Sequence, residues 1–101
     1  MMILHLINQS PFQNDNLNTC LRFIESPDSL LLIENGVYGA LQKNPCCDLL
    51  QSLSKTTQIY ALQPDVLARG IHEKLLPYVK QISYTDFVAL SVSHHAVQSW
   101  L

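Results

Sequence analysis

Charged side chains are scarce in this 101-residue sequence. Asp, Glu, Lys and Arg make up 14% of the residues, and hydrophobic residues make up 48%. An average domain has about 25% charged residues. A small domain has a large surface for its volume and should need more polar cover, not less. We therefore expect another chain to cover part of the apolar surface, and interpret the protein as a subunit of an assembly.

A basic stripe and a long apolar run are also missing. The net charge is −2, and the basic residues are scattered as Arg22, Lys43, Lys55, Arg69, Lys74 and Lys80. This distribution argues against direct binding to a nucleic-acid backbone. No apolar run approaches the roughly 20 residues that span a bilayer, and the first residues lack the basic segment of a signal peptide. We expect neither nucleic acid nor a membrane as a direct partner.

The sequence has few of the residues from which reactive sites are built. Three cysteines without spaced pairs argue against a disulfide framework and suit a reducing cytoplasm. The four histidines have no metal-ligand spacing with the cysteines, and there is no glycine-rich phosphate loop. Neither a Ser/His/Asp order nor paired acids suggest hydrolysis. We expect no metal and no cofactor, and interpret His5 as a hydrogen-bonded packing residue.

Short apolar runs alternate with segments of helical spacing. This succession predicts an α/β fold, namely a small three-layer α/β/α domain over residues 1–101. The sheet should be mostly parallel, with four to five strands and right-handed crossovers. The strands that the pattern places are residues 2–7, 29–33, 58–62 and 79–83.

Five helices are expected between and after these strands. One covers residues 17–24 and is capped by Asn14 or Asp15, and a short one covers 36–43. Another starts at Pro45, with Asn44 as its cap. The fourth helix begins at Pro64 and ends at Gly70. The fifth helix is capped by Ser83 or Thr85. In the final helix, the residues expected to pack on the sheet are Phe87, Leu90 and Val92.

The stretch SLLLIENGVYGAL, residues 29–41, contains the turn at which we expect the functional site. Its apolar run is typical of a central parallel strand, and open α/β folds build their sites at the carboxyl ends of such strands. Gly36 is expected to supply a turn conformation that other residues tolerate poorly. Glu34 and Asn35 either belong to the same turn or contact a neighbouring subunit or the tail of a carrier protein.

Several segments together resemble the TusB/DsrH family. They are Ile3-Leu4-His5 with Asn8 and Ser10-Pro11-Phe12; Leu31 to Val37; Tyr60-Ala61-Leu62 with Asp65; Ala68-Arg69-Gly70; and Tyr84 to Val88 with Leu90 and His94. The resemblance covers nearly the whole length. No segment is specific alone, but their order and spacing are similar to those of small subunits of bacterial sulfur-relay complexes.

The resemblance implies a cytoplasmic complex in which sulfur travels as a cysteine persulfide. Its expected partners are TusC/DsrF-like and TusD/DsrE-like subunits in a dimer of heterotrimers, with TusA-like and TusE/DsrC-like sulfur carriers. The principal persulfide cysteine of such complexes belongs to the TusD/DsrE-type subunit. The expected function is therefore that of a non-catalytic structural subunit, serving 2-thiolation of tRNA wobble uridine. The candidate contact residues are Glu34, Asn35, Phe12 and Tyr38.

Cys20 is the strongest candidate for a reacting residue. DsrH-type members can carry a cysteine on this helix, so an alternative function is a subunit in sulfur oxidation with Cys20 as a persulfide carrier. Cys20 also belongs to the apolar face of its helix. The competing interpretation is therefore a core thiol, although its place at the edge of that face allows partial exposure. A third hypothesis is a stand-alone α/β domain that binds a small molecule near Glu34.

Cys46 and Cys47 are a second pair of candidates. If Asn44 caps the helix, both lie in its first turn, where the helix dipole favours a thiolate. The competing interpretation is an incidental exposed or half-buried pair without a role in sulfur transfer.

Overall fold

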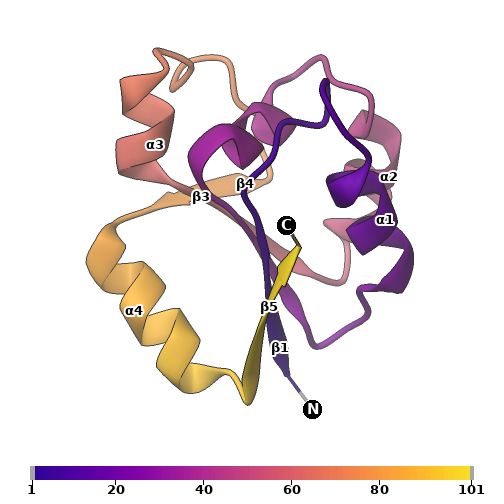
Figure 1. Ribbon diagram of the computed structural model, residues 1–101, viewed down its shortest axis with the longest axis vertical. Helices are drawn as coiled ribbons and strands as arrows, with labels where there is room; N and C mark the ends of the chain where they lie inside the picture. The colour runs from indigo at the N-terminus through magenta and orange to yellow at the C-terminus, as the bar shows by residue number, and fades with distance from the viewer. Residues whose placement is uncertain (1, 101) are drawn as a thin grey trace.

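Five parallel strands form one sheet in the order β4-β3-β2-β1-β5 (Figure 1). The computed structural model describes residues 2–100. Four strands confirm the prediction to within one residue at either end. No strand was predicted for the segment that forms β5. Their bounds are β1 Ile3–Ile7, β2 Ser29–Leu32, β3 Gln58–Leu62, β4 Val79–Ile82 and β5 Ala96–Trp100.

The direction of the connections decides which face each helix covers. From β1 to β4 the chain moves one place at a time in one direction, whereas the connection from β4 returns across the sheet to β5. Because parallel crossovers are right-handed, this reversal places α4 on the opposite face from the earlier helices. The helices are α1 Asn16–Phe23, η1 Glu34–Ala40, α2 Cys47–Leu53, α3 Gln63–Ala68 and α4 Tyr84–Ser93.

The sheet separates two apolar cores, and β2 contributes to both. Leu30 and Leu32 point into the larger core with α1, η1, α2 and Val66 of α3, whereas Leu31 points into the smaller core. All four residues of β2 are buried. This burial on both faces confirms the prediction that the apolar run is a central strand.

Helix α4 covers the smaller core less completely than expected. Phe87 and Leu90 pack over Leu4 and Leu31, but α4 has no fully buried residue. The prediction that Val92 packs on the sheet is wrong, because its side chain is 80% exposed. Val92 follows Leu90 by two positions, which turns its side chain by about 200° around the helix axis. None of the helices described within residues 2–100 has the length and apolarity to cross a membrane.

The start of α4 agrees with the prediction, whereas α1 lacks a side-chain capping bond at its N-cap. The Ser83 hydroxyl accepts from the Asp86 N–H at 3.1 Å, and Asp86 reaches back to the Ser83 N–H, which is a capping box. Helix α1 has Asp15 at its N-cap, but that side chain makes no capping bond. Instead the Asn14 side chain accepts from the Asn16 N–H at 3.0 Å. The side-chain bond to the first turn of α1 therefore comes from the residue before the N-cap.

Helix α2 begins two residues later than the Asn44-Pro45 signal indicated. The Asn44 side-chain oxygen accepts from the Cys46 N–H at 2.8 Å, and its amide nitrogen donates to the carbonyls of Gly39 and Leu41. Asn44 therefore ties the loop to the end of η1 rather than capping α2. The expected helix over 36–43 is the 3₁₀ helix η1, which starts at Glu34 and ends at Ala40.

Candidate functional site

The turn after β2 is held in place by α3. The Glu34 N–H donates to the Asp65 carboxylate at 2.7 Å, and Glu34 has a left-handed φ of 51°. Arg69 donates twice to the side-chain oxygen of Asn35, from Nε at 3.1 Å and from Nη2 at 2.9 Å. The Asn35 side-chain oxygen is thus engaged by the guanidinium, and its amide hydrogens stay available to a ligand or a neighbouring chain.

Gly36 is required for a reason other than the one expected from sequence. The left-handed conformation in this turn belongs to Glu34, whereas Gly36 packs directly on the backbone of β1. A Cβ atom at Gly36 would lie 2.0 Å from the Ile7 carbonyl oxygen and 2.7 Å from its carbonyl carbon. The prediction of a special turn conformation at Gly36 is therefore wrong. Close approach of two backbones is what excludes a side chain there.

A cavity of about 400 Å³ opens beside this turn, at the carboxyl edge of β1 and β2. The Phe12 side chain lines this cavity, and 56% of the residue's surface is exposed. Three of the four predicted contact residues line this cavity, whereas Glu34 does not. Its lining residues are Ser10, Phe12, Gln13, Asn35 and Tyr38.

Ser10, Gln13, Asp65 and Arg69 belong to this edge, although they were not predicted as site residues. Ser10 and Gln13 lie in the loop that follows β1, so the rule that sites follow parallel strands could have indicated them. Asp65 and Arg69 are four residues apart on one helical face, with an ion pair at 3.9 Å. The Arg69 guanidinium also lies 6.0 Å from the centre of the Tyr38 ring. Only the fold places α3 against this turn.

The carboxyl edge offers hydroxyl, amide and aromatic groups. Among residues 2–100, no three His, Cys, Asp or Glu side chains lie close enough together to hold a metal ion. The exposed Phe12 ring and the free amide hydrogens of Asn35 instead suit a contact with another protein, in which an aromatic anchor and polar groups combine.

Cys20 lacks the exposure and the low thiol pKa that a sulfur carrier needs. Its side chain is completely buried in the larger core, so of the two interpretations of Cys20 the structure supports the core thiol. Burial, together with the negative charge of Asp28, raises the pKa of the Cys20 thiol to about 12. The whole face of α1 that contains Leu17, Cys20 and Leu21 is turned inward. In this conformation Cys20 is a core thiol.

Cys46 and Cys47 differ from each other in their surroundings. Cys46 precedes α2 and is buried, and burial raises its pKa, with smaller contributions from Asp15 and Cys47. The expected thiolate-favouring effect of the helix start is therefore wrong for Cys46. Cys47 is half-buried, and its thiol donates to the Gln42 carbonyl at 3.1 Å.

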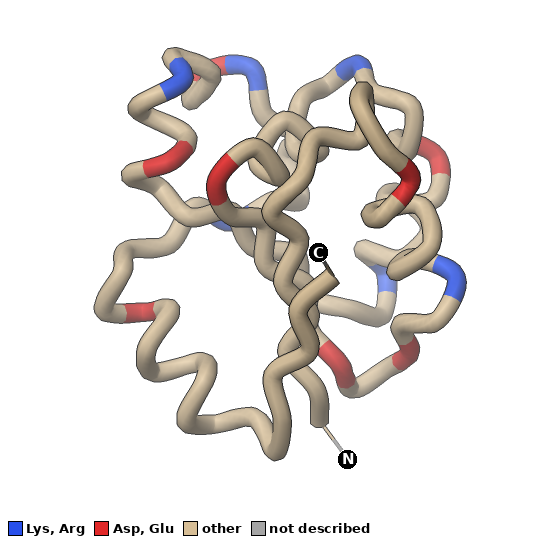
Figure 2. The backbone as a smooth tube through the Cα atoms, in the orientation of Figure 1, with Lys and Arg blue, Asp and Glu red and all other residues tan. Residues whose placement is uncertain are grey.

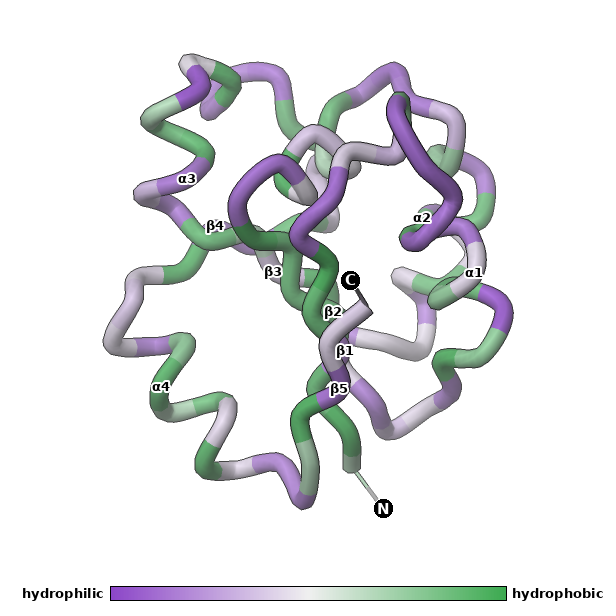
Figure 3. The backbone as a smooth tube through the Cα atoms, viewed as in Figure 1, coloured by the Kyte–Doolittle hydropathy of each residue, from purple (hydrophilic) through white to green (hydrophobic). Residues whose placement is uncertain are grey.

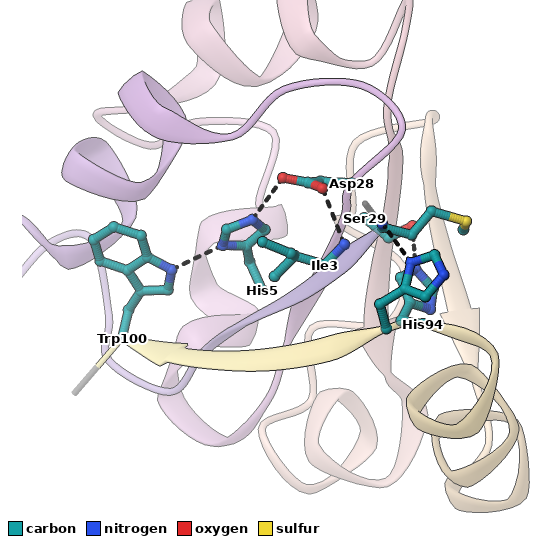
Figure 4. Close-up of polar contacts among 8 residues, drawn as sticks. Ile3, His5, Asp28, Ser29, His94 and Trp100 are labelled. Atoms are coloured by element: carbon teal, nitrogen blue, oxygen red, sulfur yellow. Dashed lines mark hydrogen bonds and ion pairs between the residues drawn. The ribbon is translucent and has the colours of Figure 1, made fainter.

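His5 is a hydrogen-bonded packing residue, as predicted (Figure 4). The Trp100 indole can only donate, so its bond of 3.1 Å to His5 Nδ1 makes that nitrogen the acceptor. His5 Nε2 therefore carries the proton and donates to the Asp28 carboxylate at 3.0 Å. The other Asp28 oxygen accepts from the Ile3 N–H at 3.0 Å. These bonds join β1, β5 and the residue before β2.

Asp28 is ionised in this cluster. Burial by itself would raise the pKa of Asp28, but the hydrogen bonds from the His5 side chain and from the Ile3 N–H lower it below the usual value. The imidazole is 5% exposed and both of its nitrogens are engaged. His5 thus stabilises the fold and has no free nitrogen to act as a general base.

His94 ends α4 and ties it to β2 (Figure 4). Its Nδ1 lies 2.7 Å from the Leu90 carbonyl, which can only accept, so Nδ1 carries a proton. Its Nε2 lies 3.0 Å from the Ser29 hydroxyl. His5 and His94 therefore bind neighbouring residues, Asp28 and Ser29, at the amino end of β2, away from the cavity that follows its carboxyl end.

Comparison with known proteins gives a consistent result along the chain. A family model described as "DsrH like protein" matches residues 9–97. Protein TusB of Buchnera aphidicola subsp. Baizongia pistaciae is 37% identical over 98 residues, which cover 97% of this chain and 100% of that protein. Protein TusB of Klebsiella pneumoniae subsp. pneumoniae is 38% identical with the same coverage.

Solved structures share the fold. The ychN protein from E. coli superposes with a TM-score of 0.88 over 98% of each chain, at 19% sequence identity. Protein Tm0979 from Thermotoga maritima superposes with a TM-score of 0.63 at 28% identity, over 91% of this chain and 93% of its own. The first of these similarities shows a common α/β architecture and nothing further about function.

Proposed function

The chain belongs to the DsrH-like protein family, and from this membership we propose that it is a non-catalytic structural subunit of a cytoplasmic sulfur-transfer complex. Family membership makes it a sulfur-relay subunit. The more specific proposal is that the complex serves 2-thiolation of tRNA wobble uridine and that this subunit positions a persulfide held by another chain. The low charged fraction of 14% supports a subunit with covered surfaces.

The burial of Cys20 is the observation that carries the non-catalytic assignment. In a persulfide relay, an acceptor thiolate attacks the terminal sulfur of the donor, the S–S bond breaks, and the donor leaves as a thiolate without net oxidation. With a pKa of about 12, roughly one Cys20 thiol in 10⁵ is ionised at pH 7. A buried thiol is also inaccessible to a carrier protein. The sulfur is therefore assigned to another chain of the complex.

Replacement of Cys20 tests this assignment. In a complex reconstituted with TusC-type and TusD-type subunits, Cys20→Ala and Cys20→Ser are expected to transfer sulfur to a TusE-type carrier at rates within about twofold of wild type. The measurement is persulfide labelling followed by mass spectrometry of every subunit. Cys46→Ala serves as the matched control, because Cys46 is also a buried thiol. Sulfur on Cys20, with transfer lost in both Cys20 variants but kept in Cys46→Ala, would establish the carrier role instead.

The carboxyl edge is the surface proposed to meet the other subunits. Its predicted contact residues Phe12, Asn35 and Tyr38 line one cavity, and the exposed Phe12 ring is suited to be an anchor. The proposed partners are TusC/DsrF-like and TusD/DsrE-like subunits in a dimer of heterotrimers, with TusA-like and TusE/DsrC-like carriers docking on the assembly.

Removal of the Phe12 ring is expected to weaken this contact. We predict that Phe12→Ala binds the TusC–TusD-type pair at least tenfold more weakly, because an aromatic anchor contributes about 2 kcal/mol. Isothermal titration calorimetry measures the affinity. Leu49→Ala is the control, since Leu49 is an exposed apolar residue on α2. If Phe12→Ala binds with wild-type affinity, the contact lies elsewhere on the surface. If the wild-type chain binds neither the TusC-type nor the TusD-type subunit, the subunit proposal is contradicted.

The tRNA branch has its own test. Deletion of the gene is expected to reduce 2-thiouridine in total tRNA, measured by nucleoside mass spectrometry, and the wild-type gene should restore it. Unchanged thiouridine together with impaired oxidation of reduced sulfur compounds would assign the complex to sulfur oxidation.

A further inference from the structure

Helix α4 crosses the sheet from one edge to the other. Because β4 and β5 are the two edge strands, the segment that joins them must pass the whole width of the sheet (Figure 1). The outer strands lie about 19 Å apart, since neighbouring strands are separated by about 4.8 Å. A helix of ten residues is about 15 Å long and about 10 Å wide. One such helix cannot cover the whole of this face.

The packing of α4 shows the same incomplete cover. Phe87 and Leu90 pack against the smaller core, but α4 has no fully buried residue, although much of the helix is hydrophobic (Figure 3). A cavity of about 330 Å³ lies between α4 and the strands β3 and β4. Small-molecule sites have volumes of about 300–1,000 Å³. The space that α4 leaves over these strands is therefore large enough for a small ligand.

The sheet side of this cavity combines a charged, a polar and an apolar group. Tyr60 of β3 and Lys80 of β4 are directly paired, so their side chains lie on the same face of the sheet. Tyr60 packs against the smaller core, which places Lys80 on the α4 face as well. Ile82 lies two residues further along β4, on the same face and about 7 Å from Lys80. The lining thus offers an ammonium group, a hydroxyl group and an apolar floor.

The helix side of the cavity comes from one face of α4. Four residues at helical spacing line it, namely Asp86, Ala89, Leu90 and Ser93. Asp86 lies in the first turn and is the only acidic residue of α4 (Figure 2). One of its carboxylate oxygens accepts from the Ser83 N–H at 3.3 Å. Within residues 2–100 no other group donates to this carboxylate, so its second oxygen is available to a ligand.

Lys80 and Asp86 line the same cavity without neutralising each other. In the part of the chain that the structure describes, no ion pair joins these two residues. Lys80 lies near the amino end of β4, whereas Asp86 follows the carboxyl end of β4 and therefore lies towards the opposite end of the cavity. The apolar side chains of Ile82 and Leu90 also line the cavity. A ligand that pairs with both charges must carry opposite charges at its two ends.

We propose that this cavity binds a small elongated zwitterion, a molecule with a carboxylate and an ammonium group at opposite ends of a short aliphatic chain. The Lys80 ammonium and the Tyr60 hydroxyl bind the carboxylate, and the Asp86 carboxylate binds the ammonium group. Ile82 and Leu90 contact the aliphatic chain. A ligand with only one charge leaves the other charge of the cavity without a partner and binds more weakly. The zwitterion also fills the space that α4 leaves over β3 and β4.

This cavity is separate from the one at the carboxyl edge. It lies on the face of the sheet that α4 covers, whereas Phe12, Asn35 and Tyr38 line the cavity at the carboxyl edge of β1 and β2. The two cavities have no lining residue in common. The inference goes beyond the proposed function and does not rest on it, since its test contains only this chain and small molecules. Failure of either proposal leaves the other unaffected.

Titration of the isotope-labelled chain, followed by NMR spectroscopy, tests the proposal. The probe is ε-aminocaproate, an elongated zwitterion, which is expected to bind with a Kd at or below about 1 mM. The amide resonances of Tyr60, Lys80 and Leu90 should shift, and those of Phe12 and Asn35 should not. Hexanoate and hexylamine each lack one of the two charges, and each is expected to bind about fivefold more weakly than ε-aminocaproate.

Exchange of the two charges is the diagnostic experiment. Lys80→Glu and Asp86→Lys each leave two like charges in the cavity, and each should weaken binding of ε-aminocaproate at least about tenfold. The double variant restores opposite charges, so the reversed ligand should bind within about threefold of wild type. Asp86→Lys removes an acceptor of the Ser83 N–H, so Asp86→Asn, which can still accept that bond, is measured beside it and should weaken binding about fivefold. Lys55→Glu is the matched control, because Lys55 is exposed and does not line the cavity.

Three results would overturn the proposal. The first is the absence of shifts at the cavity residues with ε-aminocaproate up to about 10 mM. The second is an equal affinity for one of the singly charged probes, which would make the cavity a site for simple carboxylates if the probe is hexanoate, or for simple amines if it is hexylamine. The third is wild-type affinity in Lys80→Glu or in Asp86→Asn while circular dichroism shows a folded chain.

Discussion

Gly36→Ala is expected to unfold at a far lower urea concentration than the wild-type chain. The added methyl group would lie 2.0 Å from the Ile7 carbonyl oxygen, so β1 and the start of η1 must separate. Overpacking costs about 1–3 kcal/mol when side chains can move aside, and we expect about 3 kcal/mol or more here because the obstacle is backbone. Fluorescence of the only tryptophan, Trp100, during urea denaturation measures the loss.

The two other glycines provide matched controls for this prediction. At Gly39 an added Cβ atom would lie 2.7 Å from the Leu17 Cδ2 atom, which a side-chain rotation can relieve, and at an ordinary contact distance of 3.7 Å from side-chain atoms of Leu32 and Pro11. At Gly70 it would meet nothing within 4 Å, but the φ of 64° costs an alanine about 1 kcal/mol. Gly36→Ala should therefore be the most destabilising of the three. A smaller effect than that of Gly70→Ala would contradict the close-approach explanation.

Asp28→Ala is expected to lower the free energy of unfolding by about 3 kcal/mol. The substitution removes the acceptors of the His5 N–H and of the Ile3 N–H, and an unsatisfied buried donor costs about 1–3 kcal/mol. It also frees the His5 ring that accepts from Trp100. The control is Asp15→Ala, since the exposed Asp15 side chain makes no capping bond. Equal losses in both variants would show that the cluster contributes little.

The same cluster predicts how acid affects stability. The pKa of Asp28 is lower in the folded chain than in the unfolded chain, where it is about 3.9. Its stabilising contribution is therefore complete above the unfolded pKa and is lost as the pH falls through the folded pKa. Urea titrations from pH 7 to pH 3 should show a steeper acid loss in the wild type than in Asp28→Ala. Parallel pH profiles would contradict this contribution.

Elements with a strong local pattern could be predicted well. The strands β1 to β4 are buried runs with clear ends, and the capping residue Ser83 and the left-handed Gly70 fix helix boundaries through their own backbone preferences. Strand β5 was not assigned because the segment Ala96 to Trp100 has no strong alternation. Its identity as a strand depends on pairing with β1, which is more than 90 residues away in sequence.

The candidate site was predictable in part. The rule that sites follow parallel strands selected Asn35, and the family resemblance added Phe12 to the candidate contacts. The structure brings both residues together with Tyr38 in one cavity. Arg69, which fixes the Asn35 side chain, was missed because the contact between α3 and the turn after β2 joins residues 34 positions apart.

By itself, the sequence determined the α/β succession, the central position of β2 and the shortage of charge that indicates a subunit. These properties follow from backbone preferences and side-chain periodicity within a few residues. Only the tertiary structure decided that Cys20 is buried, that Gly36 contacts Ile7, and that β5 joins the sheet beside β1. Burial and close approach depend on which distant segments meet, and no local pattern contains that information.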